Sequence, residues 1–213
     1  MIKVFGSPFS PFVRKVYLVA AFKGIEFEAE AANPRDPSAE FAACSPFRKM
    51  PAIQDEDYTL ADSTAIAAYL DAKYPEPTLF PKDPRALGRA VWWEEFADTI
   101  VMPSSGKVVF NRFVAPRFLG IEGDESIAAE GEAELGPKFD YLDSQCGDGW
   151  LAGTEFGIAD ISVATGLKTL GYVGVALDPA RHPRASAWYD RVKARREWQE
   201  VAAREAQMLG QPA

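Results

Sequence analysis

The chain has 213 residues, of which 47% are hydrophobic and 25% charged, as in an ordinary globular protein with enough material for a sizeable core. Its formal net charge of −8 argues against nucleic acid or an anionic membrane surface as the main partner. The apolar start breaks at Ser7 and Pro8, and no run of about 18 apolar residues follows. We therefore expect neither a signal peptide nor a membrane span.

The first third of the chain alternates between strand and helix patterns. Strands are predicted at residues 2–5, 25–29, 52–54 and 58–61, and helical segments at 12–22, 38–44 and 64–74. Because a helix connects the first two strands, these should run parallel. The predicted order is βαβαββα.

The composition changes in residues 75–84, which contain four prolines. We predict a domain at 1–75, a linker at 76–84 and an all-helical domain at 85–213, with helices at 85–101, 126–146, 158–170, 183–194 and 197–208. Pro103 is expected to kink or end the first of these helices. The apolar stripe of the second runs from Ile127 to Cys146, and its acidic faces are expected to be solvated.

Cysteine and histidine are scarce. Cys44 and Cys146 form neither a C-x-x-C pair nor a metal-binding spacing, which favours two free thiols in a reducing cytoplasm. The only histidine, His182, precedes Pro183 and is interpreted as a loop residue. A single histidine excludes sites that need several, so we expect no bound metal. The lack of a G-x-S-x-G motif further disfavours a serine hydrolase.

The segment that joins the first predicted strand to the first predicted helix is a candidate functional site. Ser10 stands at the expected N-cap, and Pro11 takes the first helical position, where its missing N–H costs nothing. A hydroxyl beside unpaired N–H groups and the positive end of a helix dipole can stabilise an anion. Taken alone, the pattern is that of an ordinary helix cap. Ser7 lies three residues earlier and competes for the same role.

Three motifs in this order resemble those of the cytosolic glutathione transferases. Ser10-Pro11-Phe12 opens the first helix; residues 45–53, S-P-F-R-K-M-P-A-I, are similar to N-P-x-x-K-V-P-x-L; and residues 60–70, L-A-D-S-T-A-I-A-A-Y-L, are similar to L-x-E-S-x-A-I-x-x-Y-L. The resemblance implies an α/β thioredoxin-like domain (βαβαββα) followed by an all-α domain. It also implies a cytoplasmic homodimer that uses glutathione as cosubstrate without a metal.

The resemblance assigns roles to particular residues. Ser10 would stabilise the glutathione thiolate, as in the Ser-type, bacterial-like members, with Phe12 beside it. The Met50-Pro51 bond would be cis, and the main chain of Met50 would pair with the cysteine of the ligand. Asp62 would bind the ligand's ammonium group and Ser63 its γ-glutamyl carboxylate.

The chain also departs from the family pattern. Asp62 replaces the usual glutamate. The lysine that often precedes the N-P pair is missing, which leaves Arg35, Arg48 or Lys49 to hold the glycine carboxylate. Phe5 stands where Tyr-type classes carry their tyrosine, and position 10 is not cysteine, so neither Tyr-type nor thiol–disulfide chemistry is favoured.

The expected reaction is attack of the thiolate on a small hydrophobic electrophile. Isomerisation, dehalogenation and peroxide reduction use the same thiolate, and a non-catalytic scaffold on the same fold is the alternative. Ser104 and Arg112 are predicted to line the electrophile pocket. Further aromatic residues of the helical half are assigned mainly to the core or to a subunit contact: Trp92, Trp93 and Phe96. Gly157 and Asp160 are assigned to a helix-capping motif that serves folding.

Overall fold

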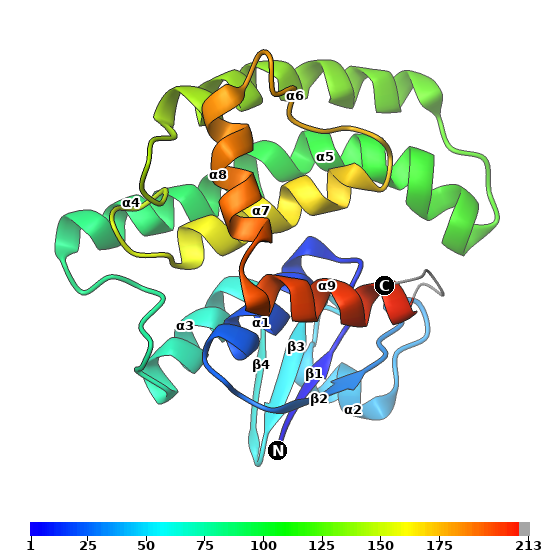
Figure 1. Cartoon of the computed structure of the whole chain (residues 1–213). Coiled ribbons are helices and arrows are strands. Elements are labelled where there is room, and N and C mark those ends of the chain that lie inside the picture. Colours follow the sequence, from blue (N-terminus) through cyan, green and yellow to red (C-terminus); the bar gives the residue numbers. More distant parts are fainter. Residues whose placement is uncertain (209–213) are drawn as a thin grey trace. The chain divides into compact units, whose positions relative to one another are not determined.

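The structure, a computed structural model, describes residues 1–208 (Figure 1). The chain forms two compact units. The first comprises Met1–Phe80 together with the segment that starts at Ala194, and the second comprises Pro81–Lys193.

The first unit is built on a four-stranded sheet with the order β2-β1-β3-β4. The central strand β1 (Ile2–Phe5) pairs in parallel with β2 (Phe27–Glu30) and antiparallel with β3 (Ala52–Asp55), which pairs antiparallel with β4 (Tyr58–Ala61). The register opposes Phe5 to Ala52, so the end of β1 lies beside the start of β3. This mixed sheet confirms the predicted α/β thioredoxin-like fold.

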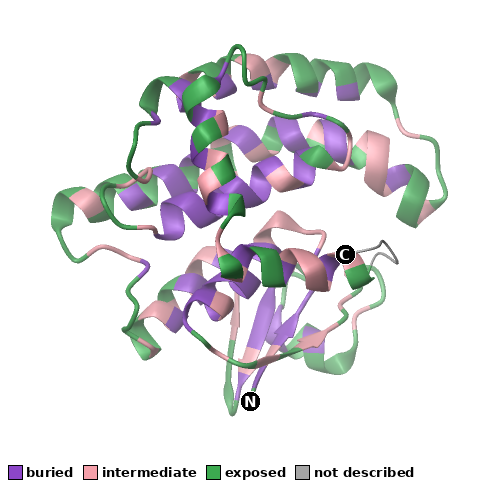
Figure 2. Ribbon diagram, in the orientation of Figure 1, coloured by how far each residue is buried: buried purple, intermediate pink, exposed green. Residues whose placement is uncertain are grey.

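Within residues 1–208, four helices belong to the first unit: α1 (Pro11–Phe22), α2 (Ala39–Cys44), α3 (Ser63–Lys73) and α9 (Arg196–Met208). Both α3 and α9 pack on α1, which is therefore buried on almost every side, and Figure 2 shows most of α1 as buried along with β1 and β3. The predicted helical domain ran to residue 213, whereas α9 lies in the first unit because its side chains bind those of α1.

The second unit starts with a long helical path: α4 (Pro84–Glu95), the π-helical segment η1 (Phe96–Val101), α5 (Met102–Val109) and the π-helical segment η2 (Phe110–Leu119). The sequence predicts that Pro103 kinks or ends this helix, and in the structure the helical path does not end there. Pro103 lies in the first turn of α5, where the missing N–H is tolerated, and the π-helical turns of η1 precede it. Trp93 and Phe96 are buried as predicted, whereas Trp92 is exposed.

The helices α6 (Glu125–Gln145), α7 (Ile158–Gly171) and α8 (Pro183–Lys193) complete the second unit. The buried stripe of α6 begins at Ala128 and not at Ile127, which is 42% exposed. Gly131 lets α6 approach α5 closely, because a Cβ there would lie 2.6 Å from the carbonyl oxygen of Ser104.

The acidic faces of α6 are partly paired rather than only solvated. Lys107 binds Glu130 and Glu134, and Arg112 binds Glu125 and Glu132. Ser104 donates to Glu134 and accepts from Lys138. Ser104 and Arg112, which are predicted to line an electrophile pocket, thus hold helices together.

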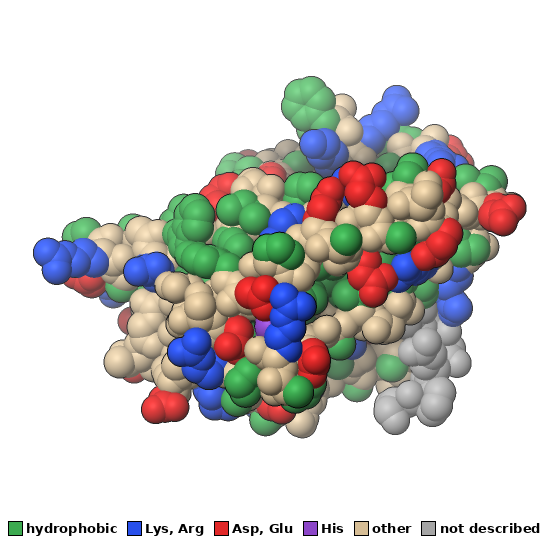
Figure 3. Space-filling model, turned by 90° about the horizontal axis from the view of Figure 1, so that it is seen from above, with side chains coloured by type: hydrophobic (Ala, Val, Ile, Leu, Met, Phe, Trp, Pro, Cys, Tyr) green, Lys and Arg blue, Asp and Glu red, His purple; other side chains and the backbone are tan. Residues whose placement is uncertain are grey.

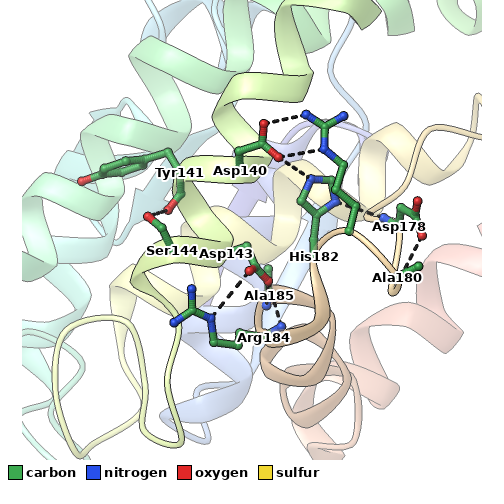
Figure 4. A network of polar contacts seen from close by, with 10 residues as sticks. Asp140, Tyr141, Asp143, Ser144, Asp178, Ala180, His182, Arg184 and Ala185 are labelled. Carbon is green, nitrogen blue, oxygen red and sulfur yellow. Dashed lines mark hydrogen bonds and ion pairs between the residues drawn. The ribbon is translucent and has the colours of Figure 1, made fainter.

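His182 lies in the loop before α8, as predicted, and it is also buried and has a structural role. Its Nδ1 accepts from the N–H of Asp178 at 3.2 Å, and its Nε2 lies 3.1 Å from a carboxylate oxygen of Asp140 (Figure 4). From the same helix, Asp143 accepts from the N–H groups of Arg184 and Ala185 and so caps α8. Side chains of α6 therefore fix the start of α8.

The capping motif before α7 forms as predicted. The Asp160 carboxylate accepts from the N–H of Gly157 at 3.2 Å, the N–H of Leu151 at 3.0 Å and Nε1 of Trp188 at 2.7 Å. Burial raises the pKa of Asp160 above that of an ordinary aspartate, although these donors oppose the shift. These contacts assign Asp160 to folding.

The charged surface is mixed in sign. Figure 3 shows acidic and basic side chains interspersed over the face that it draws. Among residues 1–208, no helix combines the length and the apolar character needed to cross a bilayer.

Candidate functional site

A cavity of about 620 Å³ opens in the first unit. Its wall comes from the first turn of α1, the end of α2, the loop between α2 and β3, the strand β4 and the start of α3. Six of the seven residues predicted for the site line it: Phe12, Lys49, Met50, Pro51, Asp62 and Ser63. The seventh, Ser10, is not part of the wall.

Ser10 caps α1 in backbone geometry, with φ −67° and ψ 126°, but its hydroxyl makes no capping hydrogen bond. The first N–H groups of α1 have no carbonyl partner within the helix. The N–H of Ser10 donates to the carbonyl of Ser7 at 2.9 Å, which closes a tight turn before the helix. Ser10 Oγ has no hydrogen-bond partner in the described part of the chain, so it is available to a ligand.

Ser7 also remains a candidate for the anion-stabilising role. Its N–H lies 3.4 Å from Sδ of Met50, so its main chain faces the loop that carries Met50. The choice of Ser10 over Ser7 stays a prediction. Phe5 lies in the sheet, 2% exposed and packed near the ring of Phe41, and has no hydroxyl to offer.

The loop before β3 presents main-chain groups to the cavity. The Met50-Pro51 peptide bond is cis. Among residues 1–208, neither the N–H nor the C=O of Met50 is hydrogen-bonded, whereas the C=O of Pro51 accepts from the N–H of Asp62 at 3.3 Å. The loop thus joins the two predicted motifs and leaves one residue's backbone groups free for a ligand.

Ser45 holds this loop in shape, a role that the sequence motif did not reveal. It is 1% exposed; its Oγ donates to the C=O of Lys49 at 2.7 Å and accepts from the N–H of Lys49 at 3.0 Å. A side chain that bonds both main-chain groups of one residue closes the turn as a backbone pair would.

Asp62 combines an unusual backbone with a free carboxylate oxygen. Its φ is +83°, in a region rarely adopted outside glycine and typical of functional sites when the surroundings enforce it. Its Oδ1 accepts from the N–H groups of Thr64 and Ala65, each at 3.0 Å, and caps α3. In the described chain Oδ2 has no hydrogen-bond partner, so one carboxylate can both cap the helix and face a ligand. Ser63 beside it lines the cavity while only 3% exposed.

Two further side chains of the wall define its electrostatics. Lys49 is the only lysine or arginine among the lining residues that the structure describes, and Arg35 and Arg48 are not among them. Burial, and then the nearby Glu40 carboxylate, raise the pKa of the Cys44 thiol, so Cys44 contributes a neutral wall. No group of three or more His, Cys, Asp or Glu side chains within residues 1–208 could hold a metal.

An ion pair supports the sheet behind this wall. Asp55 binds Lys73 and also accepts from the hydroxyl of Tyr69 at 2.7 Å. Burial opposes ionisation of Asp55, but the hydrogen bonds from Lys73 and Tyr69 outweigh it and lower its pKa. The pair ties β3 to α3, whose first turn forms part of the cavity.

Comparisons with known proteins agree with this geometry. Residues 4–78 match a family described as "Glutathione S-transferase, N-terminal domain", and residues 125–191 match "Glutathione S-transferase, C-terminal domain". A glutathione S-transferase of Hyoscyamus muticus is 30% identical over 92% of this chain and 95% of its own. Glutathione S-transferase 3 of Zea mays is also 30% identical, over 96% of this chain and 90% of its own.

The fold is also found among solved structures. A glutathione S-transferase from Sinorhizobium meliloti superposes with a TM-score of 0.87 over 95% of this chain and 92% of its own, at 23% identity. At this identity the match supports the fold alone.

Proposed function

Because the chain belongs to the glutathione S-transferase family, we propose that it binds glutathione in the cavity of its first unit and activates its thiol. The bound thiol would be held as a thiolate that attacks a small hydrophobic electrophile. The observation that carries the proposal is a set of unpaired groups around one cavity. In the described chain these are the main chain of Met50, one oxygen of Asp62 and the Lys49 ammonium.

The γ-glutamyl end of glutathione fits the start of α3. Its carboxylate would accept from the hydroxyl and the N–H of Ser63, at the start of the helix, where the dipole favours negative charge. Its ammonium group would bind Oδ2 of Asp62, the oxygen that the cap leaves free. Two adjacent residues would thus bind the two charges at the γ-glutamyl end of the ligand.

The cysteine of glutathione fits between Met50 and the start of α1. Its main chain would pair with the free N–H and C=O of Met50, as an added strand pairs with a sheet edge. Its sulfur would accept a hydrogen bond from Ser10 Oγ, with Phe12 as the neighbouring apolar wall. A free thiol has a pKa of about 8.5, and lowering it by about two units needs roughly 2.7 kcal/mol. A charge-assisted hydrogen bond and the helix dipole are of that order.

The glycine end of glutathione would reach Lys49. It lies on the cavity wall and, within the described residues, has no carboxylate partner that would compete with the ligand. Since Lys49 is exposed, its attraction for a carboxylate is screened by solvent. Lys49 therefore adds affinity and orientation but not catalysis.

Conjugation is the reaction that we propose, and isomerisation, dehalogenation and peroxide reduction start from the same thiolate. The cytoplasm is the proposed compartment, since glutathione is abundant where thiols stay reduced and both Cys44 and Cys146 are free and buried.

We further propose that the protein is a homodimer. Phe47 in the first unit is 86% exposed, and on α4 the apolar side chains of Leu87, Val91 and Trp92 are 37%, 42% and 41% exposed. Single exposed apolar residues are common, but a spacing of four residues places Leu87 and Val91 side by side on one face of α4. Light scattering should give twice the chain mass of 23.4 kDa, and a monomer mass would contradict the proposal.

The proposed function is tested by calorimetric titration with glutathione, followed by conjugation of a generic aryl halide. We expect Ser10→Ala to bind glutathione within a few-fold of wild type and to lose about 100-fold in kcat/KM, the equivalent of two pKa units. Ser38→Ala is the matched control: Ser38 caps α2 by accepting from the N–H of Phe41 at 3.1 Å and does not line the cavity.

The possible outcomes separate the alternatives. A wild-type protein that does not bind glutathione would refute the proposal. Binding without turnover of any electrophile would identify a non-catalytic binding protein on this fold.

A further inference from the structure

A buried ion pair joins the last described helix to the first. Arg14, in the first turn of α1, and Glu205, on α9, are each 1% exposed. Arg14 donates from Nε to Oε2 of Glu205 at 2.9 Å and from Nη2 to Oε1 at 2.8 Å. Burying two charges costs free energy even when they pair, and apolar residues of similar volume would often be as stable. A purely structural contact between these helices would not need them.

The same guanidinium reaches back to the segment that carries Ser10. Nη2 of Arg14 also lies 3.4 Å from the carbonyl oxygen of Phe9, the residue before Ser10. Two carboxylate contacts fix the plane of the guanidinium, and that plane determines where its other N–H groups point, among them the one that reaches the Phe9 carbonyl. Glu205 thus acts on the Phe9 carbonyl through Arg14.

We propose that Glu205 and Arg14 are positioning residues for the thiolate site, with α9 acting as the brace that holds the Ser10 turn in place. The inference rests on the proposed function of Ser10. Free rotation of the peptide between Phe9 and Ser10 would move Ser10 Oγ and tilt the turn against the first N–H groups of α1. Anchoring the Phe9 carbonyl restricts that motion before the ligand arrives, and such preorganisation strengthens stabilisation of a developing charge.

Arg204 of α9 contacts the first unit at residues outside this turn. The guanidinium of Arg204 lies 5.4 Å from the ring centre of Tyr17 and 4.8 Å from that of Phe27. Arg204 therefore helps to hold α9 on the first unit from a different side. Replacing Arg204 tests the effect of loosening α9 alone.

The main test is the double variant Arg14→Met/Glu205→Leu, with Arg204→Met as the matched control. The apolar pair should fold and unfold at nearly the same urea concentration as wild type, since it fills the space of a buried ion pair. It nevertheless removes the donor to the Phe9 carbonyl. We expect kcat/KM to fall about tenfold, with KM for glutathione changed less than twofold, because only the thiolate's surroundings are disturbed.

The bound thiolate is followed by its ultraviolet absorbance during a pH titration of the glutathione complex. The apparent pKa of the bound thiol should rise by about one unit in the double variant and stay at the wild-type value in Arg204→Met. A double variant that is as stable as wild type and keeps its thiol pKa and kcat/KM would overturn the inference. If the double variant fails to fold, Glu205→Asp, which keeps the charge but shortens the arm, should give about a threefold loss in kcat/KM, and no loss there would equally overturn it.

Hydrogen exchange separates failure of this inference from failure of the proposed function. The amide of Ser10, bonded to the Ser7 carbonyl, should exchange about tenfold faster in the double variant and at the wild-type rate in Arg204→Met. This readout needs no glutathione. If the Ser10 amide exchanges faster in the double variant but the protein forms no thiolate, the positioning of the turn by α9 is confirmed and only its catalytic role is refuted. If exchange of the Ser10 amide is unchanged, the positioning itself is refuted.

Discussion

Asp62→Asn separates the two roles that we give to one carboxylate. In wild type Oδ1 caps α3 through the N–H groups of Thr64 and Ala65, and Oδ2 is left for the ammonium group of glutathione. Asparagine keeps an oxygen in the capping position, and among residues other than glycine it is one of those that best tolerate a positive φ such as the +83° found here. The substitution therefore removes the negative charge with little change to the helix start.

The structure sets the expected magnitudes. Because the cap survives, the free energy of unfolding should change by less than about 0.5 kcal/mol. A hydrogen bond to a charged partner contributes about 1.5–3 kcal/mol, and loss of the charge should remove most of it. Since Asp62 is exposed, solvent screening places the expected loss near the lower bound, about 1.5 kcal/mol or roughly tenfold in Kd.

Isothermal calorimetry with glutathione measures the loss, and urea unfolding measures the stability. Asp83→Asn provides the matched control, because Asp83 caps α4 in the same way, accepting from the N–H groups of Arg85 and Ala86, and does not line the cavity. It should leave glutathione affinity unchanged. Equal affinity of Asp62→Asn and wild type would show that the free oxygen does not bind the ligand, and the reasoning about this site would fail.

Three further predictions test other parts of the structure. Gly131→Ala should lower the free energy of unfolding by about 2 kcal/mol in urea, because its Cβ would lie 2.6 Å from the Ser104 carbonyl oxygen, and wild-type stability would contradict the packing of α5 on α6. The folded-state pKa of Asp55 lies below its unfolded value, so its contribution to stability is present above about pH 4 and is lost as the pH falls through the folded pKa. Urea unfolding at a series of pH values should show that Asp55→Asn loses less free energy of unfolding in acid than wild type does. An identical dependence of stability on pH in the two proteins would argue against the Asp55–Lys73 ion pair. Lys49→Met should raise KM for glutathione about threefold at low salt and less at high salt, while Arg48→Met should leave it unchanged; a salt-independent effect would exclude the proposed ion pair.

The fold of the first unit could be predicted from local sequence patterns. Period-two strands, the helix that opens at Pro11 and the turn between β3 and β4 are set by neighbours along the chain, so the order βαβαββα could be predicted. The motifs around Met50 and Asp62 also placed five residues on one cavity wall, and the motif that opens α1 placed a sixth, Phe12.

The rest depends on contacts between residues far apart in the sequence. Arg14 and Glu205 are separated by 191 positions, and no local pattern links α9 to the first unit. His182 packs against the ring of Phe139 and contacts Asp140, both on α6 and more than 40 positions away in the sequence. The π-helical segments η1 and η2 escaped prediction because apolar spacing does not distinguish their hydrogen bonding from that of an α-helix over one or two turns.

The backbone conformation of Asp62 also could not be predicted from the sequence. Its positive φ is enforced by the bond from its own N–H to the Pro51 carbonyl and by the capping bonds of its side chain. Propensity would have favoured glycine or asparagine at such a position. An aspartate held there at a cost of about 1–3 kcal/mol points to a use for its carboxylate.

A pH titration of glutathione bound to the wild-type protein, followed by the ultraviolet absorbance of its sulfur, addresses the role of the first helix most directly. If the Ser10 turn and the start of α1 stabilise the anion, the thiol should lose its proton about two pH units below free glutathione, and Ser10→Ala should restore most of the difference. A bound thiol that titrates like the free tripeptide in the wild-type protein would contradict this role.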